Sequence, residues 1–97
     1  MSVMVLLEAP VKPDEIANMK SYLKEILPES RAYEGCKGFE LYFNTEDKGR
    51  MVVIEQWASR AQHEKYLGWR TETGVMAKLG GMLAGPPSMR YFEKAES

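Results

Sequence analysis

The sequence predicts an α+β fold with its elements in the order β-α-β-β-α-β around an antiparallel sheet. Three observations predict it. Residues 2–8, 36–45 and 50–57 are apolar or alternate between apolar and polar, as strands do. Residues 13–27 and 60–71 carry apolar side chains at helical spacing. Clusters of glycine, proline and polar residues between these segments indicate turns.

The first strand and helix account for the N-terminal third of the chain. The segment "SVMVLLE" is apolar and β-branched, and the turn "APVKP" follows it. Pro13 with Asp14 favours a helix start there, with an acid near the positive end of the helix dipole. Pro28 is expected to end or kink the helix, and Gly35 is expected to stop the turn that follows. The apolar face of this helix is Ile16, Met19, Leu23, Ile26 and Leu27.

A hairpin and a second helical region follow. Phe39, Leu41 and Phe43 fall on one side of the strand at 36–45, and "TEDKG" is a hairpin turn into the strand at 50–57. Ser59 predicts a helix N-cap, completed as a capping box by Gln62 three residues later. A short helix is expected over about 73–83. The last strand, "SMRYFEK", is expected at an edge or strand start because prolines precede it. The resulting order is the ferredoxin-like split βαβ pattern.

Size and composition indicate one small domain, residues 1–97, and exclude several functions. The 97 residues are 44% hydrophobic and 28% charged, with a net charge of −1, which offers no basic surface for nucleic acid or anionic lipid. The apolar runs are too short to span a membrane, and the N-terminus does not resemble a signal peptide. One cysteine excludes an internal disulfide. We therefore expect a cytoplasmic protein.

The same counts predict that no cofactor or metal is held tightly. One histidine and one cysteine cannot form a four-ligand structural zinc site, and the glycines match no nucleotide-binding loop. The strands are apolar in both phases, so the sheet face without helices should be apolar too. A homodimer packed through these sheet faces would cover it.

One cluster suggests a functional site. On a helical wheel, Tyr66, Leu67 and Arg70 share a stripe with His63, the only histidine, and Trp57 ends the preceding strand. The functional interpretation makes His63 a general acid or base and Arg70 the partner of an anion. The alternative is structural: a histidine bonded to a carbonyl group or water, an arginine that snorkels to solvent, and aromatic side chains that fill the core.

The segments "SRAYEGCKGFELY" and "VVIEQWASRAQHEKYL" resemble the antibiotic biosynthesis monooxygenase domain family. The matching features are Glu34-Gly35-Cys36 entering the second strand, Glu55-Gln56-Trp57 closing the third, and His63 in the next helix. The resemblance covers nearly the whole chain. It implies a dimeric α+β barrel with ligands bound between the sheet and the helices of each subunit.

The resemblance also implies an activity and a site. Oxygenating members of the family act on phenols, hydroquinones or anthrones with O₂ and no cofactor. His63 would then handle the proton and Arg70 would stabilise the anion. A cofactor-free isomerase and a non-enzymatic small-ligand binder stay as alternatives. Haem degradation is not expected, because the first strand has no asparagine and the chain has no second histidine. The expected substrate contacts are Trp57, Tyr66, Trp69, Glu55, Phe39 and Met76.

Overall fold

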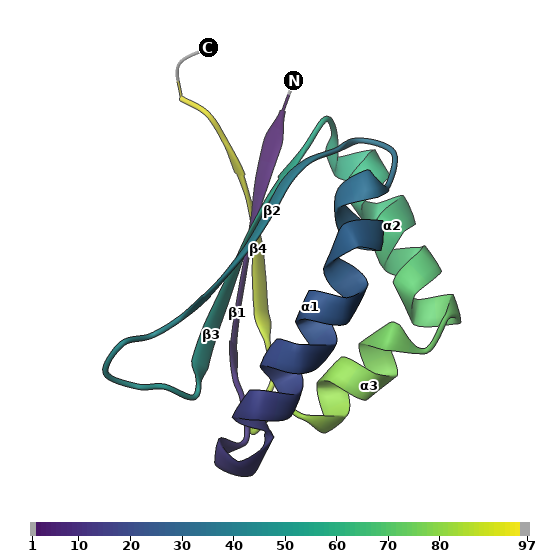
Figure 1. Cartoon of the computed structure of the whole chain (residues 1–97). Coiled ribbons are helices and arrows are strands. Elements are labelled where there is room, and N and C mark those ends of the chain that lie inside the picture. The colour runs from purple at the N-terminus through teal and green to yellow at the C-terminus, as the bar shows by residue number, and fades with distance from the viewer. Residues whose placement is uncertain (1, 96–97) are drawn as a thin grey trace.

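The computed structural model describes residues 2–95, so residues 1, 96 and 97 of the expected domain lie outside the described part. The fold is the predicted α+β arrangement, with a four-stranded antiparallel sheet and all helices on one of its faces (Figure 1). Within the described residues, no helix is long and apolar enough to cross a membrane. The elements are β1 (Val3–Pro10), the 3₁₀ helix η1 (Pro13–Glu15), α1 (Ile16–Ala32), β2 (Cys36–Phe43), β3 (Arg50–Trp57), α2 (Arg60–Glu72), α3 (Val75–Gly81) and β4 (Ser88–Glu93).

The strand order is β2-β3-β1-β4, which places β4 at an edge, one of the two positions expected from the prolines that precede it. The pairing puts four side chains in one row across the sheet. Glu55 on β3 lies opposite both Phe39 and Val5, and Val5 lies opposite Tyr91 on β4. Residues directly opposite one another point to the same face, so the whole row faces the helices.

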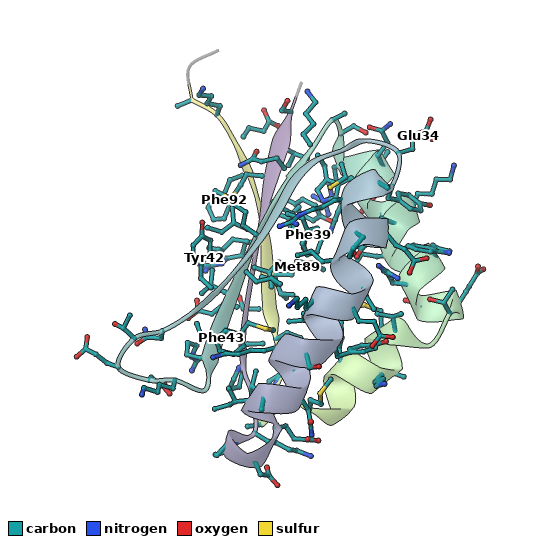
Figure 2. The ribbon with its side chains drawn as sticks, in the orientation of Figure 1. Glu34, Phe39, Tyr42, Phe43, Met89 and Phe92 are labelled. Carbon is teal, nitrogen blue, oxygen red and sulfur yellow. The ribbon has the colours of Figure 1, made fainter. Side chains whose placement is uncertain are left out.

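Alternating burial divides the sheet into an inner face and an outer face. On β3, Met51, Val53, Glu55 and Trp57 are buried under the helices, whereas the residues between them are more exposed. Figure 2 shows Phe39 and Met89 on the helix side of the sheet and Tyr42 and Phe92 on the other. A period of two is the signature of a sheet with only one covered face.

The helices cover the sheet with the stripes that the sequence predicts. The side chains of Met19, Leu23 and Ile26 on α1 are buried, and so are His63 and Tyr66 on α2. Ser59 is the N-cap of α2, because its Oγ accepts a hydrogen bond from the backbone N–H of Gln62 at 3.2 Å. Gly35 precedes β2 with φ +92°, a conformation that favours glycine.

Of the two outcomes expected at Pro28, a helix end or a kink, the helix end is wrong, because α1 runs through this residue and continues to Ala32. Proline lacks the N–H that would bond the carbonyl group of Lys24, but both residues are exposed, so water can satisfy that group. Arg70 bonds the carbonyl oxygen of Ile26 before the proline and the Oγ of Ser30 after it. These bonds tie down the turn on either side of Pro28.

Element ends differ from the predicted ones by a few residues, as is usual for helix and strand termini. The first strand continues beyond residue 8 to Pro10, and the second stops at Phe43 rather than 45. The short helix occupies Val75–Gly81, the middle of the predicted 73–83.

Candidate functional site

A cavity of about 290 Å³ lies between the inner face of the sheet and the helices, and we call it the sheet–helix cavity. Its wall is mostly aliphatic side chains and methionines, among them Met19, Leu23, Met51 and Leu79. Polar groups enter the wall from only a few positions. The side chains in the wall that carry them are Ser30, Glu55 and Tyr66.

The cavity wall includes exposed apolar side chains from α3 and β4. Met76 on α3 and Met89 on β4 both belong to its wall, and both are among the exposed large apolar side chains of the protein. Exposed methionines at the rim of an apolar hollow suit a flat apolar ligand, because their side chains are flexible and polarisable.

A second hollow, of about 440 Å³, lies between α1 and α3. Its wall includes Glu15, Asn18 and Lys78, whose side chains reach solvent, and no buried polar side chain enters it. Ligand sites are usually concave and mostly apolar with a few placed polar groups, so the sheet–helix cavity is the better candidate.

Among residues 2–95, Glu55 is the one acidic side chain in the cavity wall, and it is only 4% exposed. Its Oε1 accepts a hydrogen bond from the indole N–H of Trp57 at 2.9 Å. The same oxygen lies 3.5 Å from Nε2 of His63. A carboxyl group held this way, beside an apolar cavity, is placed to exchange a proton with a ligand.

His63 stands behind Glu55 and is fully buried, with 0% exposure. Its Nδ1 lies 2.7 Å from the hydroxyl oxygen of Tyr91. Its Nε2 is the one buried side-chain nitrogen or oxygen, among the residues described, without a hydrogen-bond partner. The 3.5 Å separation from Glu55 is thus a close approach that falls short of a hydrogen bond.

Arg70 anchors a second polar group on the other side of the wall. Its Nε donates to the hydroxyl of Tyr66 at 3.1 Å, and its Nη2 donates to Ser30 Oγ at 2.8 Å and to the carbonyl oxygen of Ile26 at 2.9 Å. Arg70 is 3% exposed, and no carboxylate in the described part of the chain lies within 4.0 Å of its guanidinium. A buried positive charge with only neutral acceptors favours negative charge nearby.

The hydroxyl groups of Ser30 and Tyr66, which we call the hydroxyl pair, lie 2.6 Å apart. Burial raises the pKa of Tyr66, against the opposing effect of its hydrogen bonds with Ser30 and Arg70, so the phenol keeps its hydrogen. The pair therefore has two hydrogens, of which one joins the two oxygens. The other is free to donate to a further acceptor.

The sequence-predicted site residues separate into three groups. Glu55, Tyr66, Phe39 and Met76 belong to the cavity wall. His63, Arg70 and Trp57 are buried behind it and reach it through Glu55 and the hydroxyl pair. Trp69 is partly buried and stacks on Tyr33, with ring centroids 5.2 Å apart, outside the wall.

Two residues that belong to the arrangement were not predicted. Ser30 continues the buried stripe of α1 one turn beyond Ile26, so extending that stripe past Pro28 would have found it. Tyr91 reaches His63 only because β4 pairs with β1, and nothing in the sequence near Tyr91 indicates that contact.

Comparison with known proteins shows consistent similarity to one family. The family model described as "Antibiotic biosynthesis monooxygenase" matches residues 2–70. The Mycobacterium tuberculosis (strain ATCC 25618 / H37Rv) protein named "Putative monooxygenase Rv0793" is 27% identical over 75 residues, which are 77% of this chain and 73% of that protein.

Solved structures share the fold over nearly the whole chain. The structure of Rv0793 superposes with a TM-score of 0.87 at 22% identity, covering 100% of this chain and 98% of that one. A conserved protein from Methanosarcina mazei Go1 gives 0.88 at 17% identity, covering 97% and 93%. A Caulobacter crescentus CB15 protein described as a "putative antibiotic biosynthesis monooxygenase" gives 0.86 at 21% identity, covering 98% and 91%. At these identities the structures establish the fold.

Proposed function

This chain belongs to the antibiotic biosynthesis monooxygenase family, and from that membership and its cavity we propose that it oxidises a small phenol or hydroquinone with O₂ and without a cofactor. The observation that carries the proposal is the carboxyl group of Glu55 in the wall of an otherwise apolar cavity. An electron-rich phenolate can reduce O₂ itself, so the protein need only bind the ring, take its proton and exclude water.

The cavity volume limits the size of the substrate. An engineered apolar cavity of about 150 Å³ binds benzene. The sheet–helix cavity measures about 290 Å³, roughly twice that volume. We therefore infer a substrate with one or two rings, and we take 1-naphthol as the reference compound.

The reaction balances when Glu55 acts first as a proton acceptor and later as a proton donor. Glu55 takes the phenolic proton, and the phenolate gives one electron to O₂. The phenoxyl radical and superoxide then join through a C–O bond at the para carbon, and Glu55 returns its proton to form a hydroperoxide. Removal of the para C–H proton breaks the O–O bond, and the hydroxide that leaves takes up this proton. The sum is 1-naphthol plus O₂ giving 1,4-naphthoquinone plus water.

The hydroxyl pair suits the anionic stage of this reaction. Its free hydrogen can donate to an oxygen that carries negative charge, and Arg70 polarises both hydroxyl groups from behind. His63 supports Glu55 from outside the cavity and need not touch the substrate. The proposed roles of His63 and Arg70 are therefore exerted through the residues that form the wall.

The test is oxygen uptake with 1-naphthol, followed with an oxygen electrode together with the absorbance of the quinone. We expect one O₂ consumed per quinone formed, with a chelator present and no flavin added. Turnover of a ligand without O₂ uptake would indicate an isomerase. Tight binding of small phenols with no turnover would indicate a binding protein, and either result would contradict the proposal.

A variant that fills the cavity provides the matched control. Ala9 belongs to the wall and is fully buried, so Ala9→Phe should occupy ligand space and abolish uptake. Ala17 is exposed on α1, and Ala17→Phe should leave uptake unchanged. Thermal unfolding of both variants checks that Ala9→Phe still folds, since overpacking typically costs about 1–3 kcal/mol. Unchanged uptake in folded Ala9→Phe would place the reaction outside this cavity.

We also propose that the protein is a homodimer formed through the outer face of the sheet. Tyr42 is 49% exposed and Phe92 41% exposed on this face, and Figure 2 shows both pointing away from the helices. Ion pairs of Glu8 with Arg50 and Arg90, at 3.9 and 3.7 Å, lie along one part of the same face. A contiguous apolar patch with charges beside it is typical of a protein interface. The apolar residues of the patch are Met4, Leu6, Tyr42, Val52, Ile54 and Phe92.

Ile54 tests the dimer, because it lies within this patch, opposite Leu6 and Glu40. Light scattering should give twice the 11.1 kDa of one chain for the natural protein and a single chain for Ile54→Glu. Burying a carboxylate opposite that of Glu40 disfavours association strongly, whereas Ile54→Val removes only one methylene group and should stay dimeric. A natural protein that is monomeric at micromolar concentration would refute the interface.

A further inference from the structure

Tyr91 and Glu55 approach the same histidine from opposite sides. They lie in one row of the sheet, separated by Val5 on the strand between them. Neighbouring strands are about 4.8 Å apart, so roughly 10 Å separates the two backbones. His63, fully buried on α2, fills this gap with one ring nitrogen toward each of them.

The two possible neutral forms of His63 are not equivalent in this setting. If Nδ1 carried the hydrogen, it would donate to Tyr91, and the bare Nε2 would face the Glu55 oxygen at 3.5 Å, lone pair against lone pair. If Nε2 carries the hydrogen, a donor and not a lone pair lies 3.5 Å from the carboxylate oxygen, a contact longer than a hydrogen bond, and the Tyr91 hydroxyl donates to Nδ1 at 2.7 Å. Only the second form gives each ring nitrogen a favourable neighbour.

We propose that Tyr91 is a positioning residue: its hydroxyl donates to Nδ1 of His63 and orients the ring so that its Nε2–H supports the carboxylate of Glu55. Nothing in the sequence comparison or the cavity wall assigns a role to this tyrosine. The functional part of the inference rests on the proposed use of Glu55 as the proton acceptor. The geometric part concerns the ligand-free protein and stands independently.

The surroundings of Tyr91 suit a hydroxyl that donates a hydrogen bond to His63. Burial is the main cause that raises the pKa of Tyr91, and the charge of Glu64 adds to it, against the opposing effect of Arg60. Tyr91 therefore keeps its hydrogen at neutral pH. The guanidinium of Arg60 lies over the tyrosine ring, 4.1 Å from its centre, and pairs with Glu64 at 3.3 Å. This contact holds the ring on its outer side.

The long Nε2 contact fits a carboxylate whose support tightens only when a ligand is bound. Hydrogen bonds of catalytic groups are often long in the ligand-free state and shorten in the complex. Glu55 Oε1 already accepts the Trp57 N–H at 2.9 Å, so the histidine supplies a second N–H toward the same oxygen. Orientation of a histidine by a third group is how such chains keep one tautomer in place.

The first arm of the test is ¹⁵N NMR of the imidazole in the ligand-free, untagged protein, where His63 is the only histidine. We expect a proton on Nε2 and a hydrogen-bonded, unprotonated Nδ1. In Tyr91→Phe the ¹⁵N chemical shift of Nδ1 should move to the value of an unprotonated imidazole nitrogen that accepts no hydrogen bond. In Glu55→Gln the proton should stay on Nε2, because the amide oxygen that accepts the Trp57 N–H still faces this nitrogen. A proton on Nδ1 in the natural protein would overturn the inference.

The second arm is turnover with 1-naphthol. Because Tyr91 is not in the cavity wall, Tyr91→Phe should lower kcat by about 10-fold, as loss of an orienting partner does, with KM unchanged. Tyr22→Phe is the matched control on α1, where no hydrogen bond of its hydroxyl connects it to His63. If Tyr91→Phe gives the same His63 ¹⁵N spectrum and the same turnover as Tyr22→Phe, Tyr91 is not a positioning residue. If the natural protein consumes no O₂, the proposed function fails while the NMR arm still decides the geometry.

Discussion

Glu55→Gln should lower oxygen uptake with 1-naphthol by about 10²- to 10⁴-fold, the range typical for loss of a general base. Glutamine has nearly the same shape as glutamate, and its amide oxygen can still accept the indole N–H that Trp57 now donates at 2.9 Å. It cannot take a proton from a phenol at neutral pH. The loss should appear in kcat, since the apolar wall that binds the ring is unchanged.

The control for this variant is Glu34→Gln, which changes an exposed carboxylate in the turn between α1 and β2 (Figure 2). It should have the uptake of the natural protein. Thermal unfolding of both variants separates loss of chemistry from loss of fold. Glu55→Gln that folds and retains more than half of the natural uptake would exclude the carboxylate as the proton acceptor, and with it the mechanism proposed above.

Much of this arrangement follows from local sequence patterns. The helical wheel placed His63, Tyr66 and Arg70 on one buried stripe of α2, and the structure confirms it. The alternation along β3 placed Glu55 in the same phase as Trp57, and both face the helices. Such periodicities depend only on the geometry of a helix or a strand, so they can be predicted without tertiary contacts.

The depth at which each side chain lies could not be predicted in the same way. Whether His63 enters the cavity or stands behind Glu55 depends on how α2 packs over β3, which residues far apart in the chain decide together. Tyr91 meets His63 through the pairing of β4 with β1, strands that are separated by most of the chain. The contribution of Ser30 was not predicted because Pro28 suggested that the helix ends or kinks there, whereas bonds from Arg70 hold that turn in the helix.

The wall of the cavity therefore combines two polar features with different chemistry. Glu55 can accept a proton, and the hydroxyl pair can donate a hydrogen bond to the oxygen that has lost one. Behind each of them stands a buried nitrogenous side chain, His63 behind the first and Arg70 behind the second. The apolar surroundings strengthen both effects, because charge is screened less there than in water.

Arg70→Met should destabilise the protein by about 2–3 kcal/mol, because it removes three hydrogen bonds in a buried site, each of net value near 1 kcal/mol. Methionine keeps most of the packing of the arginine stem, so the loss measures the guanidinium. For a domain of this size it corresponds to a fall in melting temperature of roughly 10–20 °C. Arg31→Met is the matched control: Arg31 also bonds a backbone carbonyl group, that of Phe39, but it is exposed, so its loss should be clearly smaller.

The same variant separates a structural role of Arg70 from one in ligand binding. Below its melting temperature, folded Arg70→Met should bind the phenolate of 1-naphthol more weakly, because the hydroxyl pair loses the charge behind it. Arg70→Lys restores the charge without the branched geometry and should recover binding more than stability. If Arg70→Met has the same melting temperature as the natural protein, the hydrogen bonds from Arg70 to α1 contribute nothing measurable to stability. If its phenolate affinity is also unchanged, Arg70 neither holds the helices together nor acts on the cavity, and anion stabilisation must come from elsewhere in the wall.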